Sequence, residues 1–378
     1  MANIMDYLKW RGDIPFSQVP VNAVDSLVFA ALSYLKLDGL APEGMENPVP
    51  LWVAAEALLA LPDAPERAHT RADLPLLQAA AQSPRFRGVR LCAYHSRTLY
   101  EEETQFAAMA FLMADGSAFL AFRGTDATLV GWKEDFNMSF QDTVPAQLEA
   151  LRYTEGFAAV FDGPLYLTGH SKGGNLAVFA AARSAPFVQD RMRGVYNHDG
   201  PGFGEYLMGD LGYQRMVPKI RTFVPESSII GMLLEHEEPY TAVKSTQVSI
   251  LQHDLYSWEV LGGGFVQAED VSGHSKRMNQ SIKTWLSGME KDERIAFVDA
   301  LYAVLSAGGA KKVGELSQPR NIRLFLKAMQ ADESKRKILT GELMEFLRIL
   351  GDTAHAYREK QLKAAEPEEG LQNEKTVL

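Results

Sequence analysis

Cysteine is almost absent from this 378-residue chain, in which Cys92 is the single example. One cysteine cannot form an intrachain disulfide, and a cysteine-based metal site needs several thiolates. Cys92 lies inside a segment with the composition of a strand. We therefore expect its thiol to fill space in the core and not to act as a nucleophile.

The chain also has no run of basic residues. Its 48 acidic and 38 basic residues give a formal net charge of −10, and both kinds are spread along the sequence. A surface that follows the phosphates of a nucleic acid needs clustered lysine and arginine. Nucleic acid is therefore not an expected partner.

Long hydrophobic segments are missing as well. The first thirteen residues contain neither the basic start nor the apolar stretch of a signal peptide. Nowhere do about eighteen apolar residues, the length that a membrane span requires, follow one another. We expect a cytoplasmic protein without a transmembrane segment.

Enough apolar material is present for a large core, since 46% of the residues are hydrophobic. Helical patterns occupy 22–35 and 51–61, and strand patterns occupy 89–94, 105–113 and 117–122, the last two joined by an Asp-Gly turn. Helical stretches at 146–161 and 173–183 then alternate with strand patterns at 165–168, 194–197, 219–224 and 247–252. This alternation predicts an α/β fold with a mostly parallel central sheet flanked by helices.

The pattern also divides the chain into parts. We expect an N-terminal helical segment at 1–85 that packs on a core domain at 86–287. A C-terminal helical extension follows at 288–363, with helices at 294–306, 321–329 and 333–359. The acidic segment 364–378 has the composition of a disordered tail.

One motif carries clear chemistry, the sequence Gly169-His-Ser171-Lys-Gly173. Gly-x-Ser-x-Gly between a strand and a helix is typical of a nucleophile elbow, in which a strained turn exposes the serine hydroxyl. The apolar segment 165–168 precedes the motif, and small residues follow it through 183. Ser171 is therefore the expected nucleophile, and the Lys172 amide at the start of the helix is an expected oxyanion donor.

The order of the motifs resembles that of class 3 (fungal-type) lipases. The shared features are Phe-Arg-Gly-Thr at 122–125, then Trp132 and Asp135, then the elbow. The fuller combination is similar to a bacterial branch of lipase-like α/β-hydrolases and includes the segments 7–12, 131–137, 199–203, 224–231 and 252–254. The resemblance implies an α/β-hydrolase fold, a serine nucleophile, and Thr125 as the second oxyanion donor, through its backbone amide or also through its hydroxyl.

The catalytic base of an α/β-hydrolase comes late in the chain, after the last strand of the central sheet. His253 directly follows the predicted strand 247–252, which makes it the leading candidate. His274, before a predicted helix, is the alternative. His170 stands beside the nucleophile, and we expect it to shape the turn.

The acid departs from the lipase pattern. Class 3 lipases carry an aspartate after the strand that corresponds to 220–224, where this sequence continues Pro-Glu-Ser-Ser. Asp199 ends the preceding strand, a position that some lipases use, and is the leading candidate. Glu226 is an alternative. Asp254 is disfavoured because neighbouring side chains on an extended backbone point apart, and it adjoins the candidate histidine.

Two further stretches bear on the substrate. The apolar run 229–234 predicts either a wall or lid of an acyl pocket or a core helix. Residues 132–135 stand where the resemblance to class 3 lipases would place the start of a lid, but Lys133, Glu134 and Asp135 are expected to form a charged, solvated face.

These features predict an esterase or lipase-like serine hydrolase that acts through an acyl-enzyme. Its partner would be a small-molecule ester with an apolar acyl group, and the chemistry requires no cofactor and no metal. The same residues would serve a thioesterase or an amidase. Because the aspartate that class 3 lipases use as the acid is missing, a non-catalytic binding protein that keeps the fold is also an alternative function.

Overall fold

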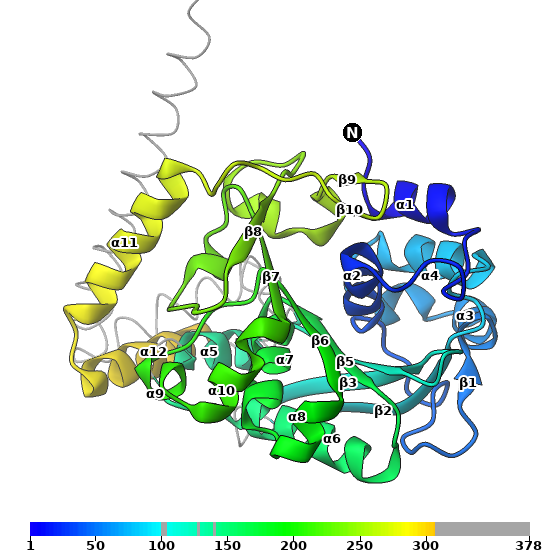
Figure 1. The fold of residues 1–378 in the computed structure, drawn as a ribbon. Helices are drawn as coiled ribbons and strands as arrows, with labels where there is room; N and C mark the ends of the chain where they lie inside the picture. The colour runs from blue at the N-terminus through cyan, green and yellow to red at the C-terminus, as the bar shows by residue number, and fades with distance from the viewer. Residues whose placement is uncertain (100–103, 127–128, 139–140, 307–378) are drawn as a thin grey trace, which may run out of the picture.

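The computed structural model describes residues 1–99, 104–126, 129–138 and 141–306. The predicted helices 321–329 and 333–359 and the predicted tail 364–378 lie outside these residues. The described elements form a mixed eight-stranded sheet with helices on both faces (Figure 1). An α/β fold is therefore confirmed.

The strands lie in the sheet in the order in which they follow one another in the chain. They are β1 (Val49–Pro50), β2 (Arg90–Leu99), β3 (Thr104–Leu112), β4 (Ala118–Phe122), β5 (Leu165–His170), β6 (Met192–His198), β7 (Ile220–Pro225) and β8 (Tyr240–Val243). Neighbours from β1 to β4 are antiparallel, and neighbours from β4 to β8 are parallel. The mostly parallel sheet of the sequence prediction is thus correct only from β4 onward; the short turn at Asp115-Gly116, for example, makes β3 and β4 antiparallel.

Crossover helices cover one face of the sheet. α6 (Pro145–Val160) precedes β5, α7 (Lys172–Arg183) and α8 (Pro186–Arg191) join β5 to β6, and α9 (Glu205–Met208) and α10 (Leu211–Met216) join β6 to β7. Because parallel crossovers are right-handed and the strands follow in order, these connections fall on the same face. Leu120, Leu167 and Val195 of the strands share one apolar core with Ala177 and Ala181 of α7.

The N-terminal helices cover the opposite face (Figure 1). They are α1 (Ile4–Arg11), α2 (Ala23–Leu32), α3 (Leu51–Leu59) and α4 (Asp73–Gln82). Side chains alternate between faces along a strand, so Phe119 of β4 points to this side and packs on Phe29 of α2, with ring centroids 4.7 Å apart. The Asn22 side chain caps α2, as its sequence pattern predicts.

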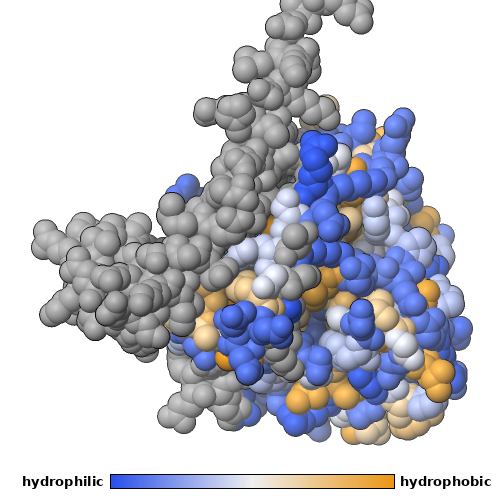
Figure 2. Space-filling model, turned by 90° about the vertical axis from the view of Figure 1, so that its left-hand side faces the viewer, coloured by the Kyte–Doolittle hydropathy of each residue, from blue (hydrophilic) through white to orange (hydrophobic). Residues whose placement is uncertain are grey.

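The chain returns to helix after the sheet, in α11 (Gly273–Ser287) and α12 (Lys291–Ser306). α12 packs against α5 (Leu129–Asn137), which follows β4. On the face of the molecule that Figure 2 shows, the coloured surface has hydrophobic residues in small groups between hydrophilic ones. None of the helices in the described ranges is long and apolar enough to cross a membrane.

The predicted strand at 247–252 is wrong. The last strand of the sheet is β8, and the chain then forms a 3₁₀ helix over Ser249–His253. The apolar residues that suggested a strand are largely solvent-exposed, Val248 by 50% and Leu251 by 60%. Side chains hold this segment instead: the Ser227 amide donates to Gln252 Oε1, and the Trp258 indole donates to the Gln252 carbonyl.

Candidate active site

Ser171 lies in the turn between β5 and α7, as its sequence context predicts. Its backbone has φ of 59° and ψ of −133°, a strained conformation for a residue with a side chain. The flanking residues must be glycines because a side chain at either position would not fit. A Cβ on Gly169 would lie 2.1 Å from Gly173, and one on Gly173 would lie 2.1 Å from the Phe122 carbonyl oxygen. The elbow therefore depends on close contact between β5, α7 and the end of β4.

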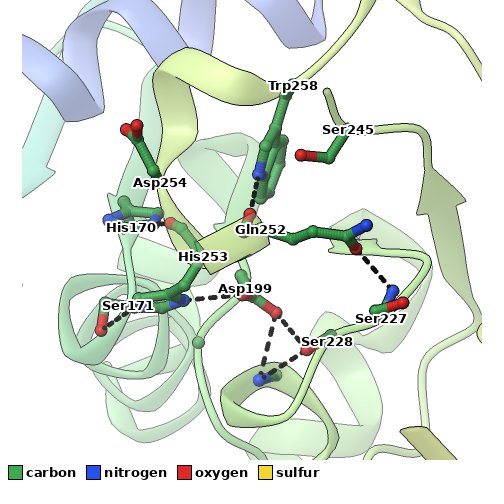
Figure 3. A network of polar contacts seen from close by, with 12 residues as sticks. His170, Ser171, Asp199, Ser227, Ser228, Ser245, Gln252, His253, Asp254 and Trp258 are labelled. Carbon is green, nitrogen blue, oxygen red and sulfur yellow. Dashed lines mark hydrogen bonds and ion pairs between the residues drawn. The ribbon is translucent and has the colours of Figure 1, made fainter. Parts of the chain in front are cut away.

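The structure brings His253 and Asp199 to Ser171 (Figure 3). His253 Nδ1 lies 2.6 Å from Asp199 Oδ2, and His253 Nε2 lies 2.9 Å from Ser171 Oγ. A carboxylate only accepts hydrogen bonds, so Nδ1 carries the proton and Nε2 is free to accept the serine proton. The three side chains thus form one hydrogen-bonded chain.

Asp199 is fully buried at the end of β6, with a positive φ of 55°. Its second oxygen, Oδ1, accepts hydrogen bonds from the Ser228 hydroxyl and the Gly231 amide. A Cβ at Gly231 would lie 2.2 Å from Asp199 Oδ1, so only glycine lets the backbone approach this closely. Sequence reasoning gives no role to Ser228 or Gly231, because their partner is set by the tertiary fold.

His170 holds the segment that carries His253. Its Nε2 lies 2.8 Å from the His253 carbonyl oxygen and must donate to it, while its Nδ1 lies 3.0 Å from the Tyr34 hydroxyl. Burial holds the pKa of His170 well below its ordinary value, so the ring is neutral and Nδ1 accepts from Tyr34. The expected shaping role of His170 therefore extends beyond the turn to the candidate base, and Tyr34 is an additional support that the sequence does not indicate.

The alternative residues take other places. The Asp254 carboxylate accepts from the Tyr256 amide and points away from His253 in Figure 3. Glu226 follows β7, but within the described residues the carboxylate that meets His253 is that of Asp199. His274 lies near the start of α11, and its side chain is outside the described residues.

The two expected oxyanion donors lie on segments that touch. A Cβ on Gly124 would lie 2.6 Å from the His170 carbonyl oxygen, so the strand end that leads to Thr125 rests against the elbow. The Thr125 hydroxyl donates to both carboxylate oxygens of Asp135, each at 2.6 Å. That hydroxyl is engaged with Asp135, which leaves the backbone amides of Thr125 and Lys172 as the candidate oxyanion donors.

The predicted solvated face at 133–135 is wrong for two of its three charges. Lys133 and Glu134 are buried, with 6% and 1% of their side chains exposed. Each has an ionic partner that the fold supplies, Asp299 for Lys133 and Lys172 for Glu134. Asp135 is half-buried, and this burial raises the pKa of its carboxyl group to about 6.

The apolar run 229–234 does not form a core helix, and its other expected role, as a wall or lid of an acyl pocket, stays a prediction. Its middle is a 3₁₀ helix, Ile230–Met232, and Met232 and Leu234 line a cavity of about 360 Å³ with His236, Glu238 and residues of α11. The candidate nucleophile and base do not line this cavity. No group of three or more metal-ligating side chains occurs in the part of the chain that the structure describes.

Comparison with known proteins shows the family to which the chain belongs. The sequence profile of the Mbeg1-like family matches residues 80–303, more than half of the chain. The chain belongs to the Mbeg1-like family. This family is lipase-like, and the matched region of this Mbeg1-like chain contains Ser171, Asp199 and His253. None of the curated proteins matches the chain.

Several solved structures are distantly similar to this Mbeg1-like protein. The native Rhizomucor miehei lipase propeptide complex is 15% identical, with a TM-score of 0.35, over 52% of this chain and 76% of the lipase. A deletion mutant of that complex is 14% identical, with a TM-score of 0.38, over 64% and 78%. The M37 lipase crystal structure is 15% identical, with a TM-score of 0.35, over 63% and 82%.

Proposed function

We propose that this protein is a serine hydrolase that cleaves carboxylic esters through an acyl-enzyme. The observation that supports this most strongly is the chain of contacts from Ser171 Oγ to His253 Nε2, and from His253 Nδ1 to Asp199. In this proposal residues 86–287 form an α/β-hydrolase catalytic domain, and the helices of 1–85 cover one face of its sheet.

In the first step His253 Nε2 takes the Ser171 proton as Oγ attacks the ester carbonyl carbon. The imidazolium that forms is stabilised by Asp199, which also keeps the Nδ1 proton in place. Two donors hold Asp199 Oδ1, so the carboxylate does not rotate away as charge develops on the ring.

The carbonyl oxygen becomes an oxyanion, which the amides of Thr125 and Lys172 would bind. Lys172 is the first residue of α7, so the partial positive charge of the helix N-terminus adds to its amide. The imidazolium then gives its proton to the departing alcohol. In the second step His253 activates water, which attacks the acyl-serine and releases the acid.

An apolar acyl group is supported by the surface beside His253. Val248 and Leu251 precede the base and leave half or more of each side chain exposed. Exposed apolar side chains that precede the base by two and five residues would favour an apolar substrate portion, since binding would remove both surfaces from water.

The test is a panel of oxygen esters, thioesters and amides with matched acyl groups of short, medium and long chain length, assayed with the purified full chain and with Ser171→Ala. We expect the oxygen esters to be hydrolysed fastest and all turnover to be lost in the variant. A faster thioester or amide would reassign the substrate class. Equal turnover by Ser171→Ala would refute the proposed nucleophile.

A further inference from the structure

Three consecutive residues of α5 connect elements that are separate in sequence. Glu134 contacts Lys172 at the start of α7, Asp135 contacts Thr125 after β4, and Lys133 contacts Asp299 on α12. Two of these partners, Lys172 and Thr125, are the residues whose amides would bind the oxyanion. One helix therefore contacts both oxyanion segments and the C-terminal helix.

The contact between Glu134 and Lys172 is a buried ion pair with its hydrogen bonds satisfied. Lys172 Nζ donates to Glu134 Oε2 at 2.9 Å and to the Gln105 carbonyl and side-chain oxygens at 2.9 and 3.3 Å. Glu134 also accepts from the backbone amides of Gln105 and Ala146. Three donors on the ammonium group thus meet three acceptors, which fixes the Lys172 side chain in one position.

The Lys172 side chain is buried in the protein, with only 1% of it exposed. Its backbone, however, is the first residue of α7 and adjoins the nucleophile. A residue held at its side-chain end cannot shift its amide freely. The ion pair therefore has a direct geometric effect on where one oxyanion donor points.

Lys133 extends this connection to the C-terminal region. Its Nζ lies 2.7 Å from Asp299 Oδ1 and 5.0 Å from the centroid of the Tyr302 ring, both on α12. The Lys133 side chain is 6% exposed, so it lies between the two helices and not in solvent. The position of α5 thus depends on α12.

We infer that α5 sets the oxyanion hole, with Glu134 as a positioning residue for the Lys172 amide and Lys133 as the residue through which α12 holds α5. This inference rests on the proposed function. Oxyanion donors contact the transition state more strongly than the ester, so their displacement lowers kcat and leaves KM nearly unchanged. A purely structural role for the ion pair would change stability without this kinetic signature.

The test variant is Glu134→Met/Lys172→Met, which replaces the pair with apolar side chains of similar length and leaves no unpaired buried charge. We expect a folded protein whose kcat falls about tenfold to a hundredfold, with KM within about twofold, because donor misplacement and not donor loss is involved. Arg183→Met is the matched control, since it removes a partly exposed ion pair at the other end of α7. We expect it to keep the wild-type kcat.

A second variant tests the role of α12. It also keeps the inference testable if the double variant does not fold. Lys133→Met keeps an apolar contact with Tyr302 and removes the ion pair to Asp299, and we expect kcat to fall about threefold with KM unchanged. If either folded variant keeps the wild-type kcat, the corresponding part of the inference is wrong while the proposed function stands. If the wild type neither hydrolyses esters nor reacts with a fluorophosphonate, both fall.

Discussion

Asp199 and His253 meet across 54 positions of sequence, with 2.6 Å between Asp199 Oδ2 and His253 Nδ1. Asp199 ends β6, and His253 ends a 3₁₀ helix beyond β8. Because the two residues lie on separate segments, the protein needs additional contacts to keep them in register. Ser228 and Gly231 supply these contacts for Asp199, and His170 supplies one for His253.

Asp199→Asn should fold normally and lose about four orders of magnitude in kcat. Ser228 and Gly231 both donate to the Oδ1 position, so the amide oxygen must take that place and the amide NH₂ must face His253 Nδ1. The ring is then forced into the tautomer with the proton on Nε2, which cannot accept the serine proton. Steady-state kinetics with a parallel thermal unfolding measurement check this, and a loss smaller than about tenfold would contradict the assigned acid.

Gly231→Ala should impair activity without any change to the three reacting side chains. The added Cβ would lie 2.2 Å from Asp199 Oδ1 and 2.8 Å from a Val224 methyl group, so the backbone must move away from the acid. We expect kcat to fall about tenfold or more, as for loss of a charge-assisted hydrogen bond. Gly209→Ala is the control because a Cβ there meets no atom within 4 Å. Equal kcat values for the two variants would argue against the role of the Gly231 amide.

His170→Ala should lower kcat about tenfold, because the His253 carbonyl loses the donor that holds its segment. His170→Gln, whose side-chain amide can donate to the same carbonyl, should recover part of the loss. Steady-state measurement of kcat for both variants tests whether the His170 contact holds the His253 segment. Full activity in His170→Ala would show that the His253 segment is held without this contact.

Asp135→Asn should change the pH dependence of stability. The pKa of Asp135 is raised from 3.8 to about 6, so the folded chain holds this proton more tightly than the unfolded chain. Tighter proton binding stabilises the folded wild type at low pH, and this part of its unfolding free energy is lost as the pH rises from about 4 to about 6. The variant carries no such proton, so its unfolding free energy does not fall in this way. Relative to wild type, the variant should gain about 1–2 kcal/mol in unfolding free energy between pH 4 and pH 7, with allowance for partial exposure.

Urea unfolding at both pH values measures this difference for Asp135→Asn. Asp142→Asn, at an exposed position, is the control and should show no such gain. A stability difference between Asp135→Asn and wild type that stays constant or shrinks with rising pH would contradict the stated effect of burial.

Local patterns explain what could be predicted from the sequence. The elbow depends on residues 165–183, which lie together in the chain, so strand, turn and helix can all be inferred around Ser171. Asp199 can be placed because it ends a strand beside the elbow. His253 is the leading candidate because it follows a predicted strand; that strand is a 3₁₀ helix, yet the structure still brings His253 beside Ser171.

Contacts between distant segments explain what could not be predicted. Lys133 and Glu134 look like surface charges until Asp299 and Lys172 are brought beside them, and burial follows from those partners. The same holds for Gly231, whose importance comes from the approach of Asp199. Sequence periodicity reports which face of an element is apolar and carries no information on which distant side chain will neutralise a buried charge.

Activation of Ser171 as a nucleophile is tested most directly by intact-mass measurement after treatment with a fluorophosphonate. An activated serine displaces fluoride from the reagent and retains one phosphonyl group. We predict a single adduct on the wild-type chain and none on Ser171→Ala. No adduct on the wild type after long exposure, or the same adduct on Ser171→Ala, would contradict the account.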